Sequence, residues 1–190
     1  MLLADRSVET SNGKLSDQLT TDAGEKSGKG WLLGIQGAKY VAVGERELIH
    51  ILPEPPALRR VPRAPRHACH VMVWQERILP VIDVAVLCNE AGVFEPLTKS
   101  MVGVVAFRST GGGKAKAGDR KSIGMGALLL QSVPRRLETE ETRPCDLPEH
   151  LQPLAKWSLS CLDHPEYGAL PILNLSMLFS VTQGLAMDSV

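Results

Sequence analysis

The segment that decides the fold is residues 71–84, which read Val71-Met72-Val73-Trp74-Gln75-Glu76-Arg77-Ile78-Leu79-Pro80-Val81-Ile82-Asp83-Val84. Two apolar runs flank a short polar tip, and this pattern predicts two strands joined by a tight turn. Pro80 has no backbone N–H, so its position favours an edge strand or a bulge. Asp83 is a favoured N-cap residue and predicts a short helix directly after the second strand.

Similar short apolar runs, separated by turn residues, continue on both sides of this segment. Leu48, Ile51 and Leu52 would share one face of a helix, so residues 45–52 are predicted to be helical. A second short helix is expected at 176–179. The remaining runs are typical of strands and lie at 31–35, 40–43, 102–107, 123–130, 157–162 and 170–175. Many short strands with little helix predict an all-β barrel or sandwich.

The two ends of the chain differ from this pattern. Residues 1–29 are polar and aperiodic and are predicted to be a flexible tail, because they cannot bury enough apolar surface to offset their ordering entropy. The globular domain is expected over 30–181, and a second tail over 182–190. A Gly- and Lys-rich insertion at 109–121 and an acidic stretch at 138–150 are predicted to be loops.

Composition excludes several classes of protein. The chain has 190 residues, enough for one domain, and its 21 basic and 21 acidic residues give a net charge of +0. A protein whose whole surface binds a polyanion such as nucleic acid would need an excess of basic residues, which this chain lacks. The sequence contains no long apolar run typical of a transmembrane helix and does not begin like a secretory signal, so we expect a cytoplasmic protein. The four cysteines form no CxxC motif and are expected to be reduced thiols.

The zero net charge conceals two patches of opposite sign. Residues 108–121 contain five basic residues and one acidic residue, whereas residues 138–150 contain five acidic residues and one basic residue. In a binding protein, such patches would select partners and guide encounter. Two solvated loops are the alternative interpretation.

No established catalytic motif is present, and the sequence has no GxSxG. One enzymatic hypothesis remains open, a small metal- or thiol-dependent enzyme that uses Cys69, His70, Cys161 and His164. Cys and His are the ligands that zinc prefers, but the spacing of these four is unlike that of a zinc finger.

A basic stretch, Arg59-Arg60-x-x-Arg63-x-x-Arg66, offers a third hypothesis, a nucleic-acid-binding barrel. It lacks the interleaved aromatic residues on which bases stack, so an acidic protein partner is favoured over nucleic acid. Trp74 has two open interpretations. It is either a core residue or a half-exposed anchor for a partner, since binding hot spots favour Trp.

Residues Ile78-Leu79-Pro80-Val81-Ile82-Asp83 resemble the signature of the CheW-like domain, and the order of the other elements agrees over about residues 31–180. The resemblance implies an all-β fold of two small five-stranded β-barrels packed together, with short helices. It also implies a non-catalytic adaptor of bacterial chemosensory or type IV pilus twitching systems. The partners it implies are the regulatory domain of a CheA-type histidine kinase and chemoreceptors; we expect no cofactor and no direct membrane insertion.

The resemblance also implies where partners bind. The Asn-Leu-Arg-Gly tip of the family is replaced here by Val73-Trp74-Gln75-Glu76. Glu76 stands where the family has glycine, and a Cβ disfavours the positive φ of such a turn. We therefore expect a divergent member with a changed partner set. The expected partner-binding residues are Val73, Trp74, Gln75, Glu76, Arg77, Ile78 and Pro80.

Overall fold

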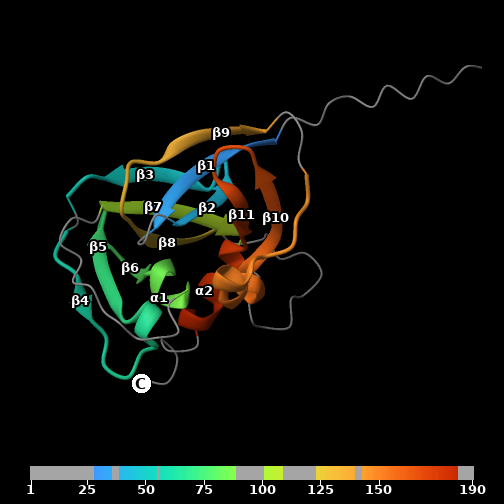
Figure 1. Cartoon of the computed structure of the whole chain (residues 1–190). Helices are drawn as coiled ribbons and strands as arrows, with labels where there is room; N and C mark the ends of the chain where they lie inside the picture. The colour runs from blue at the N-terminus through green and yellow to red at the C-terminus, as the bar shows by residue number, and fades with distance from the viewer. Residues whose placement is uncertain are drawn as a thin grey trace, which may run out of the picture.

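The computed structural model describes residues 28–35, 39–54, 56–88, 101–108, 123–139 and 143–183. They form two sheets and several short helices (Figure 1). Sheet A has the order β10-β11-β2-β1-β9, and sheet B has the order β3-β7-β8-β6-β5-β4. The strands of sheet A are β1 (Gly28–Ile35), β2 (Lys39–Gly44), β9 (Arg135–Thr139), β10 (Ser158–His164) and β11 (Gly168–Leu173). Those of sheet B are β3 (Leu48–Leu52), β4 (Arg59–Arg60), β5 (His70–Trp74), β6 (Arg77–Ile82), β7 (Met101–Arg108) and β8 (Ile123–Leu130).

The helices are short and connect or cover the sheets. They are η1 (Arg66–Ala68), α1 (Val84–Cys88), η2 (Glu149–Trp157) and α2 (Leu175–Gln183). The all-β class with two packed sheets is confirmed. The expected two five-stranded barrels are corrected in detail: sheet B has six strands, and within the described residues neither sheet joins its two outer strands by hydrogen bonds.

The alternation of strand residues creates three hydrophobic cores. In β1, Leu33 and Ile35 face a central core between the sheets, whereas Leu32 faces a smaller core on the other side of sheet A. In β7, Val105 faces the central core and Val104 faces a second small core inside the curl of sheet B. Successive strand side chains point to opposite faces. Both faces of these strands are therefore buried, which explains their nearly continuous apolar sequences.

The predicted helix over 45–52 is wrong. Leu48–Leu52 forms β3, which pairs with β7, and a bulge interrupts the register between Leu48 and His50. The extra residue of a bulge breaks the two-residue alternation. Leu48 is consequently buried, Ile49 and His50 are exposed, and the resulting apolar spacing imitates that of a helix.

Pro80 lies in an interior strand rather than in the edge strand that its residue type favoured. β6 pairs with β5 from Arg77 to Val81, including Pro80 opposite Val71. On its other side, β6 pairs with β8 only at Val81 and Ile82. Pro80 thus precedes the doubly paired part of the strand, where its missing N–H costs no ladder hydrogen bond with β8.

The ends of the domain differ slightly from the expected boundaries. β1 already includes Gly28 and Lys29, which pair with β9, and α2 continues to Gln183. The other residues of both expected tails lie outside the described residues, as does the insertion at 109–121. The acidic stretch at 138–150 is not a loop throughout: its first two residues end β9 and pair with β1, and its last two begin η2. Its residues 140–142 lie outside the described residues.

The predicted helix cap at Asp83 is confirmed. Its buried Oδ1 accepts hydrogen bonds from the N–H groups of Ala85 (3.0 Å) and Val86 (3.4 Å) at the start of α1. Burial raises the pKa of Asp83 above its ordinary value of 3.8, and the two N–H groups lower it in part. The native state therefore binds this proton more tightly than the unfolded chain does. As a result, this carboxyl makes stability fall as pH rises from 3.8 through its folded pKa.

Two substitutions at Asp83 distinguish the effect of its capping hydrogen bonds on stability from the effect of its buried charge. Asp83→Ala removes the acceptor and is expected to lower the free energy of unfolding by about 1 kcal/mol. Asp83→Asn keeps an acceptor oxygen without a charge to bury, so it is expected to flatten the decline of stability with rising pH. Urea unfolding at pH 4 and pH 7 measures both effects. Equal losses in the two variants at both pH values would contradict this assignment.

Candidate protein-docking surface

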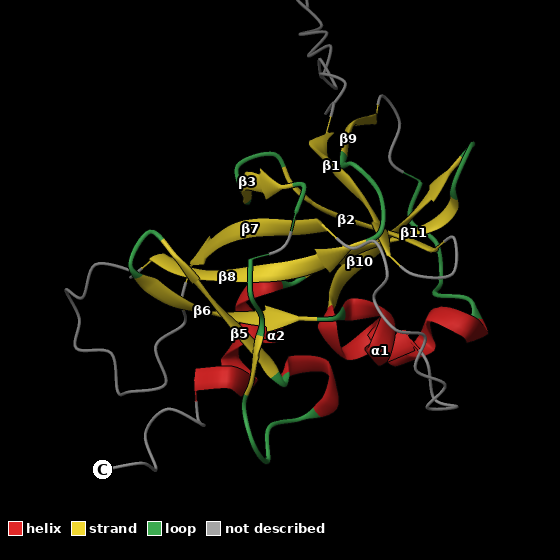
Figure 2. Cartoon of the chain, turned by 90° about the vertical axis from the view of Figure 1, so that its left-hand side faces the viewer, coloured by secondary structure: helices red, strands yellow, loops and turns green. Residues whose placement is uncertain are grey.

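The β5–β6 hairpin lies at the end of sheet B, on the opposite side of the molecule from β10 (Figures 1 and 2). Its register places Val71 opposite Pro80 and Val73 opposite Ile78. Since strand side chains alternate between faces, these four share the outer face of the hairpin. The alternate pairs, Met72 with Leu79 and Trp74 with Arg77, share the inner face.

The outer face is apolar and open to solvent. Val73 and Ile78 lie directly opposite each other, and both stay largely exposed, Val73 at 60% and Ile78 at 72%. A hollow of about 280 Å³ begins beside them. Its lining consists of Pro56, Ala57, Arg59, Val71, Met72, Val73 and Ile78. Apolar side chains next to a surface depression are typical of a protein-docking site.

The backbone beside this hollow is also open. Cys69 accepts a hydrogen bond from the N–H of Val61 (2.7 Å), on the β4 side of β5. Backbone groups of alternate residues point to the same side, so those of Val71 and Val73 point there too. β4 pairs only with His70 and Val71. Within the described residues, the N–H and C=O of Val73 therefore have no partner strand. They form a short open edge of sheet B, to which another strand can add.

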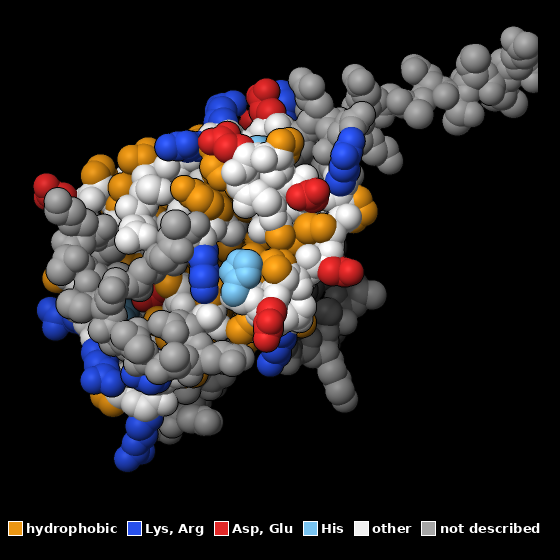
Figure 3. Space-filling view, viewed as in Figure 1, with side chains coloured by type: hydrophobic (Ala, Val, Ile, Leu, Met, Phe, Trp, Pro, Cys, Tyr) orange, Lys and Arg blue, Asp and Glu red, His pale blue; other side chains and the backbone are white. Residues whose placement is uncertain are grey.

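A basic rim lies on the β4 side of the open edge, where Arg59 and Arg60 pair with Val71 and His70 and the other two arginines follow along the chain. Arg59, Arg60, Arg63 and Arg66 are all exposed. Figure 3 shows Lys and Arg side chains along the lower left of the molecule, where β4 and the chain after it lie in Figure 1. We call the hollow, the Val73 edge and this arginine rim the docking surface. Its chemistry suits an extended acidic segment that carries an apolar side chain.

The tip of the hairpin is a two-residue turn with positive φ at both central residues. Gln75 has φ 46° and Glu76 has φ 63°. This backbone matches a type I′ turn, in which Asn-Gly is favoured. Both residues carry a Cβ and yet adopt the left-handed conformation, in which a Cβ is sterically unfavourable.

Glu76→Gly is expected to stabilise the protein. Glycine reaches φ 63° without the steric cost of a Cβ, and this gain outweighs its greater entropy in the unfolded chain, for a net effect of about 0.5–1 kcal/mol. Chemical denaturation measures the change, and Glu76→Ala, which keeps the Cβ, is the matched control. Equal stability of the Gly and Ala variants would show that the turn carries no such strain.

The structure divides the expected partner-binding residues into three groups. Val73, Ile78 and Pro80 lie on the outer face, and Gln75 and Glu76 form the tip. The inner-face residues are Trp74 and Arg77.

Trp74 is half-buried and packs against the core inside sheet B, with its ring 5.9 Å from that of His50. The guanidinium of Arg77 donates to the sulfur of Met125 at 3.5 Å. The indole thus faces the core of sheet B and not the docking surface. The far wall of that surface, Pro56 and Ala57, was not among the expected residues. The sequence signal that could have indicated it is the prolyl run Pro53-Glu54-Pro55-Pro56.

The residues of the enzymatic hypothesis do not come together. Cys69 contacts His70 (Sγ to Nδ1, 3.5 Å) beside β5 of sheet B, whereas Cys161 and His164 lie in β10 of sheet A. Positions i and i+3 of a strand face opposite sides, so β10 directs Cys161 away from His164. Within the described part of the chain, no group of three or more His, Cys, Asp or Glu side chains is placed to hold a metal.

The protonation of the Cys161 thiol also argues against its use as a catalytic nucleophile. Burial, followed by the interaction with the neighbouring Cys145 thiol, raises the pKa of Cys161 to about 12. Because the thiolate is the reactive form, this sulfur is a weak nucleophile at neutral pH. His164 makes other contacts, since its Nδ1 accepts from the N–H of Glu166 (3.1 Å) and its ring packs on Tyr167.

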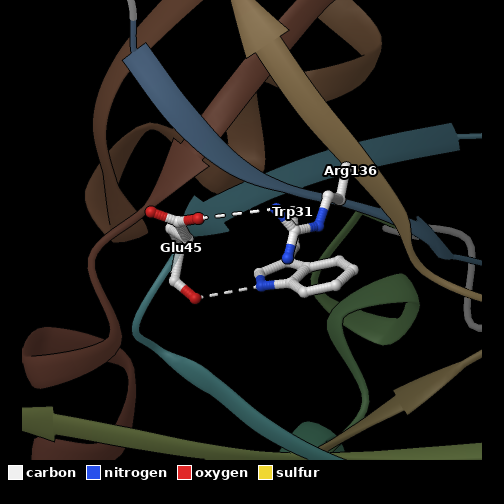
Figure 4. Close-up of polar contacts among 3 residues, drawn as sticks. All are labelled: Trp31, Glu45 and Arg136. Carbon is white, nitrogen blue, oxygen red and sulfur yellow. Dashed lines mark hydrogen bonds and ion pairs between the residues drawn. The ribbon is translucent and has the colours of Figure 1, made fainter.

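Away from the docking surface, a cluster of three side chains joins β1, β9 and the turn after β2 (Figure 4). The indole N–H of Trp31 donates to the carbonyl of Glu45 (3.0 Å), and the Arg136 guanidinium lies 5.5 Å from the Trp31 ring and 3.7 Å from the Glu45 carboxylate. Both charged side chains are exposed, so their ion pair contributes little to stability. The depression that these residues line has no room for a water molecule, so the cluster connects the two strands and the turn and offers no binding site.

The comparisons with known proteins support one fold. No protein-family model and no curated protein matches the chain. Thirteen chains of solved structures match, among them the scaffolding protein TtCheW from Thermoanaerobacter tengcongensis. That match has a TM-score of 0.56 at 13% identity and covers 80% of this chain and 87% of TtCheW. The chain therefore has a CheW-like fold, as the resemblance at 78–83 implied.

Within the described residues, no helix combines the length and the hydropathy that crossing a membrane requires.

Proposed function

We propose that this protein is a non-catalytic scaffold adaptor that binds signalling proteins of a bacterial chemosensory system. Its first expected partner is the regulatory domain of a CheA-type histidine kinase. The CheW-like fold, shared with a protein described as a scaffold, supports this class of function. The observation that carries the proposal is the exposed apolar pair Val73 and Ile78 beside the open backbone edge of Val73.

The docking surface suggests how the partner binds. An extended partner segment adds to the edge of β5, where the N–H and C=O of Val73 supply main-chain hydrogen bonds. One apolar side chain of the partner enters the hollow between Ala57 and Ile78. Acidic residues of the partner meet the arginine rim, which accelerates association and selects against basic competitors.

The same surface favours a protein partner over nucleic acid. Its centre is apolar and its basic residues lie at the rim, whereas nucleic-acid surfaces place basic and aromatic residues at the contact itself. A chemoreceptor is the second expected partner, in a cytoplasmic chemotaxis or twitching-motility assembly. The altered Gln75-Glu76 tip gives this chain a partner set different from that of proteins with the family tip.

Isothermal titration calorimetry with the full chain tests the proposal. The titrants are the regulatory domain of the CheA-type kinase encoded by the same genome and, separately, the cytoplasmic tip of a chemoreceptor. We expect 1:1 binding of the kinase domain that weakens as salt rises from 50 to 500 mM, because the arginine rim is screened. Failure of both titrants to bind a folded chain would overturn the proposal, and tighter binding of an oligonucleotide would replace it.

A further inference from the structure

A segment outside the main sheets lies along the outer edge of β10. The N–H of Asp163 donates to the carbonyl of Arg143 (2.8 Å), and the N–H of Cys145 donates to the carbonyl of Cys161 (3.0 Å). Between these two bonds, Pro144 forms an antiparallel bridge with Leu162. We call residues 143–147 the edge segment. It covers the strand edge that sheet A would otherwise expose beside β10.

This pairing brings two cysteines face to face. With Pro144 opposite Leu162, the next pair in the antiparallel ladder is Cys145 opposite Cys161. Directly opposite residues of a hydrogen-bonded antiparallel pair have Cα atoms about 5.5 Å apart, within the range of about 4.4–6.8 Å that a disulfide spans. The Cys145 thiol donates to the Cys161 sulfur at 3.0 Å. Closure to the ~2.05 Å of a disulfide bond therefore needs only a small movement of the sulfur atoms.

The two thiols differ in access. Cys161 is only 6% exposed, whereas Cys145 is half-buried and is the sulfur that a solute reaches first. The other two cysteines, Cys69 and Cys88, are buried, and within the described residues neither has a second sulfur in contact. Cys145 and Cys161 thus form the one dithiol in the described part of the chain.

We propose that Cys145 and Cys161 are an oxidation site that closes to an intrachain disulfide, with a hydroperoxide as the oxidant. The Cys145 sulfur attacks hydrogen peroxide, the O–O bond breaks, and a sulfenic acid and one water form. Cys161 is a weak nucleophile toward solutes, but its sulfur is held in contact with that of Cys145, and this proximity offsets its low reactivity. The Cys161 thiol therefore attacks the sulfenic sulfur and gives up its proton, the S–O bond breaks, and a second water leaves. Two thiols lose two electrons and two protons, and one peroxide is reduced to two waters.

The bond would fasten the edge segment to β10. It would close a loop of about 16 residues and reduce the entropy of the unfolded chain. It would also hold the outer edge of sheet A closed, so that the edge of β10 is released only under reducing conditions. This site is independent of the docking surface, which lies in sheet B.

Peptide mapping of the full chain tests the pairing. The protein is treated with hydrogen peroxide, its remaining thiols are blocked with N-ethylmaleimide, and it is digested with trypsin. Cleavage after Lys156 places Cys145 in peptide 137–156 and Cys161 in peptide 157–190, while Cys69 and Cys88 fall in two other peptides. We expect peptides 137–156 and 157–190 to be linked by a disulfide, and Cys69 and Cys88 to be alkylated. Alkylation of all four cysteines, or links to Cys69 or Cys88, would overturn the proposal.

Thermal unfolding tests the consequence. Oxidation is expected to raise Tm by about 6–12 °C in the wild type and in Cys88→Ala, and to leave Tm unchanged in Cys145→Ser. Cys145 is half-buried, so its replacement leaves the core intact. The Asp163 amide, which bonds to the edge segment, should also exchange its hydrogen more slowly after oxidation. An unchanged Tm and unchanged exchange in the oxidised wild type would contradict the fastening role.

Discussion

Ile78→Glu is expected to weaken binding of the kinase regulatory domain by about 30-fold or more, which is the effect of losing a binding hot spot. Ile78 is 72% exposed in the free protein, so the substitution removes little buried surface from the fold. In the complex, the new carboxylate would be desolvated against an apolar partner side chain and would repel an acidic one. Calorimetric titration measures the affinity, and the thermal transition should stay within about 1 °C of the wild type.

Leu159→Glu is the matched control for this prediction. Leu159 is also exposed (64%) and lies in β10, on the opposite side of the molecule. The same chemical change there is expected to leave the affinity unaltered. If Leu159→Glu weakens binding and Ile78→Glu does not, the partner surface lies on sheet A and the docking surface has been assigned wrongly.

Phe179→Ala is expected to lower the free energy of unfolding by about 3–5 kcal/mol, the cost of removing a large buried aromatic side chain. Phe179, in α2, is 1% exposed and stacks on Phe107 of β7 with ring centroids 4.8 Å apart. Its ring also occupies the space that a Cβ at Gly126 of β8 would fill. α2 therefore closes the central core between the two sheets. Urea unfolding followed by circular dichroism measures the loss.

A double-mutant cycle makes this prediction specific. Gly126→Ala should destabilise the wild type, because the new methyl group overlaps the Phe179 ring, and should destabilise the Phe179→Leu background less. Met177→Ala, at an exposed position of the same helix, is the control and should change stability by less than about 0.5 kcal/mol. Additive effects of the two core substitutions would mean that their side chains do not meet.

Local sequence patterns predicted the centre of the fold well. Strand, turn, strand and capped helix follow one another within residues 71–84, so turn chemistry and the Asp83 cap report directly on the structure. Prediction failed where tertiary pairing altered the local pattern. The bulge at β3 removed the alternation from Leu48 to Leu52, and the apolar spacing then resembled that of a helix.

In the candidate site, too, local patterns predicted some features, whereas others depend on tertiary pairing. The exposure of Val73 and Ile78 follows from alternation along two strands whose ends the sequence marks clearly. The inward direction of Trp74 depends on the register, which a turn of two rather than three residues fixes. The Cys145–Cys161 contact joins segments 16 residues apart through a ladder with no sequence signature, so nothing in the spacing of the cysteines indicated it.

The central claim is that the open edge of β5 binds the partner. The most direct measurement is amide hydrogen exchange by NMR in the free chain and in its complex with the kinase regulatory domain. We predict that the Val73 amide, unpaired in the free chain, exchanges at least about 10-fold more slowly in the complex, as it does when a strand is added to a sheet edge. Unchanged exchange at Val73, with protection confined to β9 or to the edge segment at 143–147, would contradict the account.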